Sequence, residues 1–188
     1  ALIIVITGRP GIGKTTVFTK VVEEVRKYGF VVGGMICPEV RSGGVRTAFK
    51  IVDLMNGSQG VLASTSVKCP ENLRVGKYCV NVDDAIFIGV KAIEDAVSKA
   101  DLTCIDEIGP MELKVKEVRN AIINALKNSK NVLAVVHWRL NDHAVIELIK
   151  TARTYEVTLR NRDNLPNIIV NELLKSLKKR EGVLPTRN

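Results

Sequence analysis

Aromatic residues are scarce in this sequence. Phenylalanine, tryptophan and tyrosine make up 4% of its 188 residues, with a single tryptophan. A protein that binds single-stranded nucleic acid by base stacking needs several aromatic side chains, so this composition argues against such a platform. Apolar runs are also short, and none reaches the roughly 18 residues that a membrane-spanning helix requires. We read the apolar run at residues 2–6 as a first strand and not a signal peptide, and expect a cytoplasmic protein without membrane contact.

Cysteine and histidine are too few and too scattered to form a recognisable metal-binding motif. The cysteines include no C-x-x-C pair, and the histidines His137 and His143 lie far from all of them in sequence. Because cytoplasmic proteins keep their thiols reduced, we expect free cysteines with no chemical role. The four positions are Cys37, Cys69, Cys79 and Cys104.

Length and charge indicate one domain with an anionic partner. Residues 1–188 are within the usual size of a single domain, and a hydrophobic content of 46% is sufficient for a core. The net charge of +8 suits a nucleotide or a nucleic acid. Part of the excess follows apolar residues near the end of the chain, where a solvated helix face is the favoured interpretation, so nucleic acid is possible but not favoured. These basic residues are Lys175, Lys178, Lys179 and Arg180.

Apolar runs alternate with segments of helical periodicity along the chain. This alternation predicts an α/β fold with a doubly wound, mainly parallel sheet and a hairpin turning at residues 41–46. The predicted strands are 2–6, 30–37, 47–54, 60–64, 78–82, 102–105, 131–136 and 154–159. The predicted helices are 14–27, 83–99 with Asp83 or Asp84 as its cap, 115–128, 143–150 and 164–180.

The first strand leads into a phosphate-binding loop, the Walker A motif G-x-x-x-x-G-K-[ST]. Its fixed positions are Gly8, Gly13, Lys14 and Thr15, and a helical segment follows them. Glycines let backbone N–H groups approach phosphate oxygens, and the helix directs its positive end at the same point. Lys14 can reach the β- and γ-phosphates, and the Thr15 hydroxyl can bind Mg²⁺. The motif therefore predicts nucleoside triphosphate binding.

Two acidic residues follow the apolar segment 102–105 and predict the second half of this site, a Walker B sequence. Ligands of parallel sheets bind beyond the carboxyl ends of the strands, so Asp106 and Glu107 are expected to face Lys14 and Thr15. Asp106 would hold Mg²⁺, and Glu107 would orient or deprotonate an attacking water. A helix cap is the alternative role for either acid.

Several other polar residues leave their roles open. His137 and Arg139 follow the strand 131–136 and can emerge at the same edge, although strand ends often carry polar residues without such a duty. Arg41 and Arg46 flank the hairpin turn, where contact with the phosphates and a purely solubilising role are equally supported. Arg9 lies in the loop with the same two alternatives.

These motifs together resemble the small P-loop nucleoside triphosphatases that include the human cancer-related nucleoside-triphosphatase and its archaeal and bacterial relatives. Besides the loop, the resemblance rests on four further blocks between Glu39 and Asp163. They are Glu39-Val40-Arg41, then Gly44, Arg46 and Phe49, then Asp106-Glu107-Ile108-Gly109-Pro110-Met111-Glu112, and Asn161-Arg162-Asp163. Pro110 departs from the lysine that we expect in many relatives.

The resemblance implies a three-layer fold with a RecA-like sheet and Mg²⁺-dependent hydrolysis of ATP, GTP, CTP and UTP to the diphosphate and phosphate. It also implies two nucleotide-binding segments. The first is Gly8, Arg9, Pro10, Gly11, Ile12, Gly13, Lys14 and Thr15. The second is Leu102, Thr103, Cys104, Ile105, Asp106, Glu107, Ile108 and Gly109. In this mechanism water attacks the γ-phosphate, Lys14 neutralises charge, Thr15 and Asp106 hold the metal, and Glu107 positions the water. Asn161 and Arg162, at the end of the last predicted strand, would lie near the base or ribose.

Two rival functions use the same loop. A nucleotide or small-molecule kinase would need an acceptor pocket and a lid, for which the segment 65–77 with Lys68, Arg74 and Lys77 is the only candidate. A nucleic-acid-dependent ATPase would exploit the net positive charge. The acidic pair favours water as the acceptor and so argues against the kinase; phosphate release with and without RNA or DNA would separate the nucleic-acid-dependent ATPase.

Overall fold

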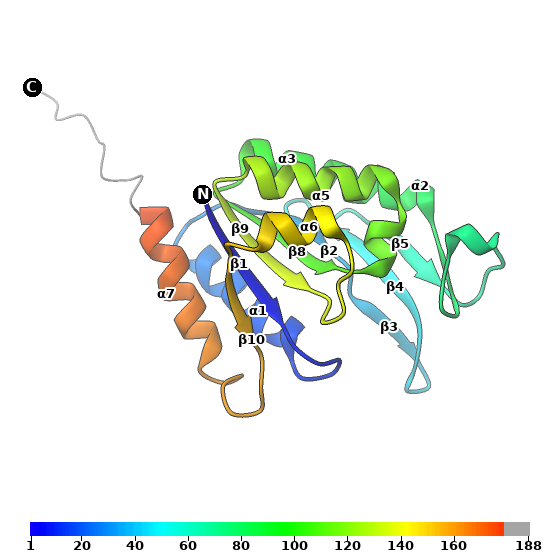
Figure 1. Ribbon diagram of the computed structural model, residues 1–188, viewed down its shortest axis with the longest axis horizontal. Helices are drawn as coiled ribbons and strands as arrows, with labels where there is room; N and C mark the ends of the chain where they lie inside the picture. Colours follow the sequence, from blue (N-terminus) through cyan, green and yellow to red (C-terminus); the bar gives the residue numbers. More distant parts are fainter. Residues whose placement is uncertain (179–188) are drawn as a thin grey trace, which may run out of the picture.

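The computed structural model describes residues 1–178 and has three layers, with helices on both faces of a ten-stranded sheet (Figure 1). The predicted α/β class with a mainly parallel central sheet is confirmed. The predicted final helix reaches Lys178, and its expected last residues, Lys179 and Arg180, lie outside the described residues.

The elements follow one another in the order that alternating periodicity predicts. The strands are β1 (Leu2–Thr7), β2 (Val32–Ile36), β3 (Glu39–Ser42), β4 (Val45–Asp53), β5 (Gln59–Ser64), β6 (Arg74–Val75), β7 (Tyr78–Val80), β8 (Leu102–Ile108), β9 (Asn131–Val136) and β10 (Arg153–Glu156). The helices are α1 (Lys14–Lys27), α2 (Val82–Asp84), α3 (Lys91–Lys99), α4 (Pro110–Lys114), α5 (Lys116–Asn128), α6 (His143–Ile149) and α7 (Leu165–Lys178), together with the 3₁₀-helix η1 (Glu71–Leu73) and the π-helix η2 (Ala85–Val90).

The sheet combines a parallel half with an antiparallel half. Its order is β10-β1-β9-β8-β2-β4-β5-β7-β6, and β3 pairs with β4. The first five strands of this order are parallel, whereas β4 runs antiparallel to β2, and each later neighbour is antiparallel as well. The carboxyl ends of β1, β8 and β9 consequently meet at one edge, where the phosphate-binding loop begins.

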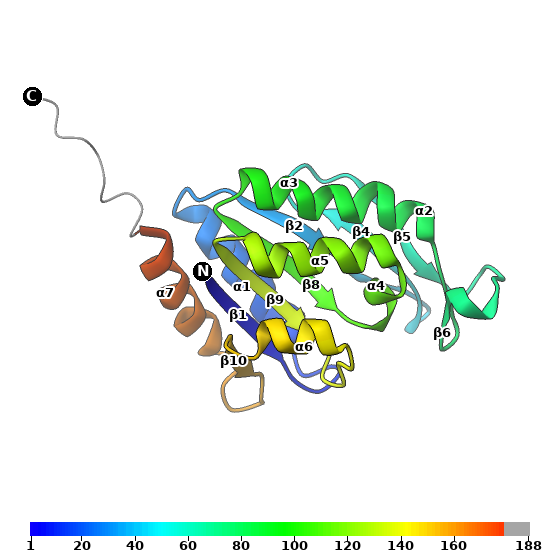
Figure 2. The same cartoon turned by 45° about the horizontal axis from the view of Figure 1, so that its top comes forward.

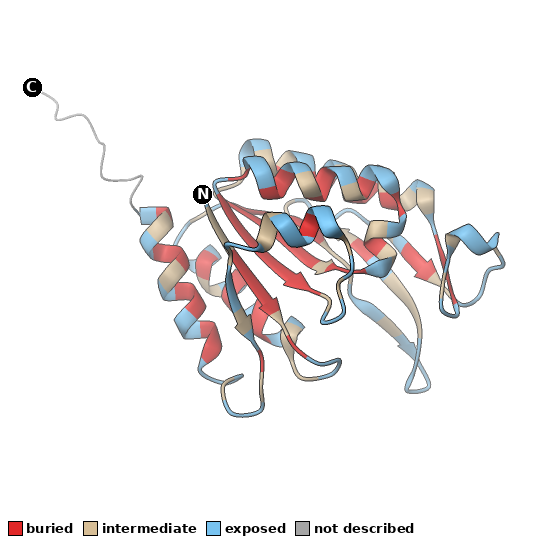
Figure 3. Ribbon diagram, viewed as in Figure 1, coloured by how far each residue is buried: buried red, intermediate tan, exposed pale blue. Residues whose placement is uncertain are grey.

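Each face of the sheet has its own core. Alternate residues of a strand point to opposite faces, so Ile4 and Ile6 of β1 pack with α1 and α7, whereas Val5 packs in the cluster formed by η2, α3 and α5. Figure 2 shows α3, α5 and α6 over one face, and Figure 3 shows the buried strands between the helical layers. The central strands are covered on both sides, so β8 and β9 are buried along almost their whole length.

Several predicted boundaries were wrong for local reasons. The helix predicted from Asp83 or Asp84 is capped by Asn81, whose Oδ1 accepts from the Asp84 backbone N–H at 3.0 Å. Asp84 is unavailable as a cap because its carboxylate accepts from the Val61 N–H at 2.8 Å. The last strand ends at Glu156 and not at residue 159. The expected turn 41–46 is mostly strand, since β3 and β4 pair on either side of residues 43–44.

The expectation of four free thiols was also wrong. Cys69 and Cys79 form a disulfide that ties the segment before η1 to β7, whereas Cys37 and Cys104 are free. The prediction assumed a reducing compartment, and a spacing of ten residues gives no sign of pairing by itself. No helix among residues 1–178 is long and apolar enough to cross a membrane.

Candidate active site

The loop between β1 and α1 has the backbone shape that its glycines predict. Gly8, Gly11 and Gly13 have φ values of 146°, 76° and 112°, a region that other residues rarely adopt. A Cβ atom at Gly8 would also lie 3.0 Å from the Val157 carbonyl oxygen. Lys14 folds back over the loop, and its Nζ donates to the Gly8 carbonyl at 2.7 Å. The ammonium group and the amino end of α1 therefore face the same space.

A hydrogen bond joins the two predicted nucleotide-binding segments. Thr15 Oγ1 donates to Asp106 Oδ2 at 3.1 Å across 91 positions of sequence. β9 lies between β1 and β8 in the sheet, and the parallel register brings both carboxyl ends to one edge. The structure thus places a hydroxyl and a carboxylate beside the phosphate-binding loop.

Asp106 and Glu107 are adjacent in sequence, and burial raises the pKa of both carboxyl groups while the charge of Lys14 lowers it. β8 continues past the predicted end at Ile105, and its register with β9 shifts between Asp106 and Ile108, so Glu107 is the extra residue of a bulge. Burial raises the pKa of Asp106 to about 6, although the Thr15 hydrogen bond and the Lys14 charge lower it. Burial also raises the pKa of Glu107 to about 7, with Lys14 opposing. A carboxyl group with a pKa near neutrality is suited to proton transfer.

Glu112 is a buried carboxyl group to which the sequence motifs assigned no role. Its side chain is 5% exposed. A Cβ atom at Gly109 would lie 2.8 Å from Glu107 Oε1 and 3.2 Å from Glu112 Oε2, so the two carboxyl groups flank Gly109 closely. Glu112 is the third residue of α4, the position from which the glutamate of a capping box reaches back toward the residue before the helix, here Gly109. That spacing from Gly109 was the signal that could have revealed it.

The buried Glu112 predicts a pH-dependent stability. Burial, and then the charge of Glu107, raise the pKa of Glu112 to about 8 from 4.5. Between these values the folded protein binds a proton that the unfolded chain releases, so the free energy of unfolding should fall as the pH rises from 4.5 to 8. Glu112→Gln keeps a neutral side chain of similar shape and should flatten this fall.

Urea denaturation of both proteins in EDTA between pH 5 and pH 8 measures the effect. We expect the difference in stability between variant and wild type to move in favour of the variant as the pH rises. Parallel stability curves would show that Glu112 is ionised throughout this range.

The side chains of His137 and Arg139 lie in different surroundings. Burial and the charges of Lys14 and Arg139 lower the pKa of His137, which places its ring within the field of the loop. The His137 Nδ1 accepts from the Arg139 backbone N–H at 3.1 Å. The Arg139 guanidinium lies 4.3 Å from the Trp138 ring centroid. His137 is therefore near Lys14, while the Arg139 side chain packs on the chain's only tryptophan.

The two hairpin arginines also differ in their surroundings. Arg41 Nε lies 2.7 Å from a Glu39 carboxylate oxygen, and its Nη1 donates to the Gly44 carbonyl at 3.0 Å, so Arg41 links the two ends of the turn. Arg46 instead bonds Tyr78, and its charge acts on Glu107. Arg9 is an exposed residue of the loop.

Asn161 and Arg162 follow β10 by several residues, so their predicted place at the end of the last strand was wrong. Asn161 Nδ2 donates to the Glu156 carbonyl at 2.8 Å, and its Oδ1 accepts from the Thr158 N–H at 2.8 Å. The Asn161 side chain therefore stabilises the turn in which it lies. Arg162 Cδ lies 3.8 Å from where a Cβ of Gly13 would be, which places this arginine against the phosphate-binding loop.

The site offers few metal-binding side chains. Among residues 1–178, no three His, Cys, Asp or Glu side chains gather in a way that would hold a metal ion. Mg²⁺ in nucleotide-binding proteins needs no such cage, because one carboxylate with substrate phosphates and water is its usual environment. The Thr15 hydroxyl and the Asp106 carboxylate, both oxygen ligands and 3.1 Å apart, fit this requirement.

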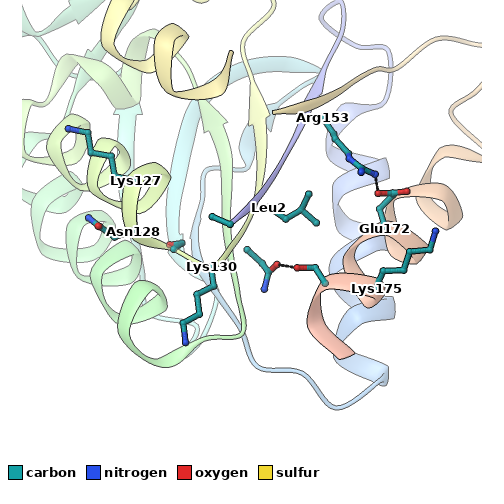
Figure 4. A pocket seen from close by; sticks show the side chains of 11 residues that line it. Leu2, Lys127, Asn128, Lys130, Arg153, Glu172 and Lys175 are labelled. Carbon is teal, nitrogen blue, oxygen red and sulfur yellow. Dashed lines mark hydrogen bonds and ion pairs between the residues drawn. The ribbon is translucent and has the colours of Figure 1, made fainter. Parts of the chain in front are cut away.

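A cavity of about 660 Å³ lies at the opposite edge of the sheet (Figure 4). It is lined by the first residues of β1 and β9 and by the ends of α5 and α7, and none of the predicted site residues contributes to it. Lys127 and Lys175 belong to the last turns of these helices, where positive charge offsets the helix dipole. The positive charge of these two residues thus has a structural cause.

Comparison with known proteins identifies similar chains along nearly the full length. A family profile described as NTPase matches residues 3–170. The nucleoside-triphosphatase THEP1 of Thermofilum pendens is 44% identical over 171 residues, which cover 89% of this chain and 93% of that protein. The THEP1 of Methanopyrus kandleri is 41% identical over 180 residues, covering 94% and 98%.

Two solved structures share the fold. The crystal structure of THEP1 from Aquifex aeolicus aligns with a TM-score of 0.78 and 31% identity, covering 92% of this chain and 99% of that one. The solution structure of a human cancer-related nucleoside triphosphatase aligns with a TM-score of 0.78 and 29% identity, covering 94% and 99%.

Proposed function

Because the chain belongs to the NTPase family and is a nucleoside triphosphatase, we propose that it hydrolyses ATP, GTP, CTP and UTP to the diphosphate and phosphate in a Mg²⁺-dependent reaction. The observation that carries this proposal is the hydrogen bond between Thr15 and Asp106, which joins the phosphate-binding loop to the acidic strand. The single sheet that runs through the described residues supports one domain for the whole chain.

The loop and α1 bind the triphosphate. Backbone N–H groups of the loop and the amino end of α1 face the phosphates, and the Lys14 ammonium exchanges the Gly8 carbonyl for phosphate oxygens. Thr15 and Asp106 would hold Mg²⁺. When bound, the ion supplies positive charge that offsets the negative charge of the β- and γ-phosphates.

Glu107 acts on the attacking water. Its carboxyl group lies in the field of Lys14, and its pKa of about 7 leaves a substantial fraction ionised at neutral pH. The carboxylate accepts a proton from water as the water oxygen bonds to the γ-phosphorus and the bond to the β-phosphate oxygen breaks. The products are the nucleoside diphosphate and inorganic phosphate.

Broad base use follows from the residues near the loop. The Asn161 amide, which could otherwise read a base edge, is committed to the Glu156 carbonyl and the Thr158 N–H. Arg162 lies along Gly13 and donates weakly to the Ile12 carbonyl at 3.5 Å. Contacts of this kind support binding through the phosphates and sugar with little discrimination between bases.

The structure of the segment 65–77 does not support its role as the lid of a kinase. The segment 65–77 contains η1 and β6, and β6 is the last strand at the far side of the sheet from β1. The disulfide between Cys69 and Cys79 further attaches this segment to β7. This attachment to β7 argues against a segment that moves freely over Lys14.

Phosphate release from each of the four triphosphates tests the proposal. With Mg²⁺ we expect kcat/KM values within about tenfold of one another, since a pocket that makes no specific hydrogen bonds discriminates only by factors of this order. EDTA should abolish turnover. Hydrolysis confined to one base, or unchanged in EDTA, would contradict the broad specificity or the metal dependence respectively.

A further inference from the structure

The register of the sheet places Arg46 beyond the carboxyl ends of β2 and β8, the edge at which the two predicted nucleotide-binding segments meet. Ile36 of β2 lies opposite both Asp106 of β8 and Val52 of β4. Since β4 is antiparallel to β2, the residues that precede Val52 continue beyond the carboxyl ends of β2 and β8. Figure 1 accordingly shows the β3–β4 hairpin projecting on the same side as the loop between β1 and α1.

Two aromatic rings and a hydroxyl hold the Arg46 side chain. Its Nε donates to the Tyr78 hydroxyl at 3.0 Å, and that hydroxyl donates to the Arg46 carbonyl at 3.2 Å. The guanidinium carbon lies 5.1 Å from the Phe49 ring centroid and 5.8 Å from that of Tyr78. Tyr78 is itself 5% exposed, so its ring is a fixed support. An arginine that served only solubility would not need such contacts.

The Arg46 guanidinium is only partly engaged, through Tyr78 and Glu39. Its nearest carboxylate, Glu39, is 3.6 Å from Nη1 and bonds Arg41 more closely, at 2.7 Å. Donor groups of Arg46 therefore remain for an anionic ligand, whereas Arg41 is bound within the hairpin.

We propose that Arg46 is a catalytic residue that donates hydrogen bonds to the γ-phosphate oxygens and stabilises the charge that develops during hydrolysis. This inference rests on the proposed function. The guanidinium remains protonated throughout. Water forms the new bond to phosphorus, the bond to the β-phosphate oxygen breaks, and the proton of the water goes to Glu107. A fixed donor aimed at developing charge acts mainly on kcat, because it contacts the transition state more strongly than the bound substrate.

Arg46→Ala and Arg46→Lys test the proposal, with Arg41→Ala as the matched control from the same hairpin. We expect Arg46→Ala to lower kcat by about 100-fold and to change the Kd for a non-hydrolysable triphosphate less than about threefold. Lysine should recover only part of the loss, since an ammonium lacks the planar donor fork. Arg41→Ala should stay within about twofold, as expected for exposed ion pairs. Trp138, near His137, provides a fluorescence signal for nucleotide binding, and thermal melts establish that each variant folds.

A second measurement separates this inference from the proposed function. Binding of the diphosphate with aluminium fluoride, which imitates the transferring phosphoryl group, should weaken in Arg46→Ala while binding of the diphosphate alone does not. Unchanged binding of this complex, a kcat within threefold of wild type, or an equal loss in Arg41→Ala would each overturn the role of Arg46. A wild type that binds the complex without releasing phosphate would contradict the hydrolytic function alone, and the binding comparison would still decide Arg46.

Discussion

Glu107→Gln is expected to lower kcat for triphosphate hydrolysis by about 1,000-fold, the range of general base catalysis, while the Kd for a non-hydrolysable triphosphate changes little. The amide keeps the shape and neutral-state hydrogen bonding of the side chain, so the buried site should fold as before. It cannot accept the proton of the attacking water. The loop, Lys14, Thr15 and Asp106 are untouched by the change, which is why binding should survive.

Single-turnover phosphate release and fluorescence titration with Trp138 measure the two quantities separately. Glu94→Gln is the matched control. Glu94 is an exposed glutamate of α3, and α3 packs on the opposite face of the sheet from α1. Its kinetics should equal those of the wild type. Full hydrolysis by Glu107→Gln would remove Glu107 from the mechanism, and a parallel loss of binding would make it a ligand-holding residue.

The elements of the parallel half of the sheet could be predicted closely from sequence. β9 is buried along its whole length and was predicted at its observed bounds, and α1 begins and ends at the predicted Lys14 and Lys27. These segments have strong local signals, an apolar run or an apolar helical face. Helix α4 was missed because its five residues are too short for periodicity, and it begins at a proline that breaks the apolar pattern.

The antiparallel half could not be predicted in detail because its pairing is set by tertiary contacts. β3 is four residues long and mostly exposed, and it becomes a strand only by pairing with β4. The Cys69–Cys79 disulfide depends on the packing of η1 and β7, which no local pattern records.

The residues of the candidate site also differ in whether local sequence or tertiary contacts determine their role. Lys14, Thr15 and Asp106 belong to contiguous motifs whose fixed spacing indicates their chemistry before any coordinates. Arg46 acquires its surroundings from a residue far along the chain, Tyr78. Sequence alone therefore left the two hairpin arginines equivalent, whereas the structure separates them by their partners.

Lys14→Ala is expected to weaken triphosphate binding by about 100-fold, the cost of removing one partner from a buried charge-assisted hydrogen bond. Turnover should fall further, because the ammonium also offsets the charge that develops on the leaving diphosphate. The folded protein should lose little stability, since Lys14 makes one side-chain hydrogen bond, to the Gly8 carbonyl. The pKa of Glu107 should rise when the opposing Lys14 charge is removed.

Calorimetric titration with a non-hydrolysable triphosphate, together with urea denaturation, separates binding from folding. Lys20→Ala is the control, because it removes one lysine from an exposed position of the same helix and leaves the net charge of the two variants equal. If both variants lost the same affinity, binding would depend on the overall positive charge and not on a specific contact. High salt distinguishes the two cases as well, because screening weakens a diffuse attraction more than a short hydrogen bond within the loop. Wild-type affinity in Lys14→Ala would mean that the loop amides and α1 alone bind the triphosphate.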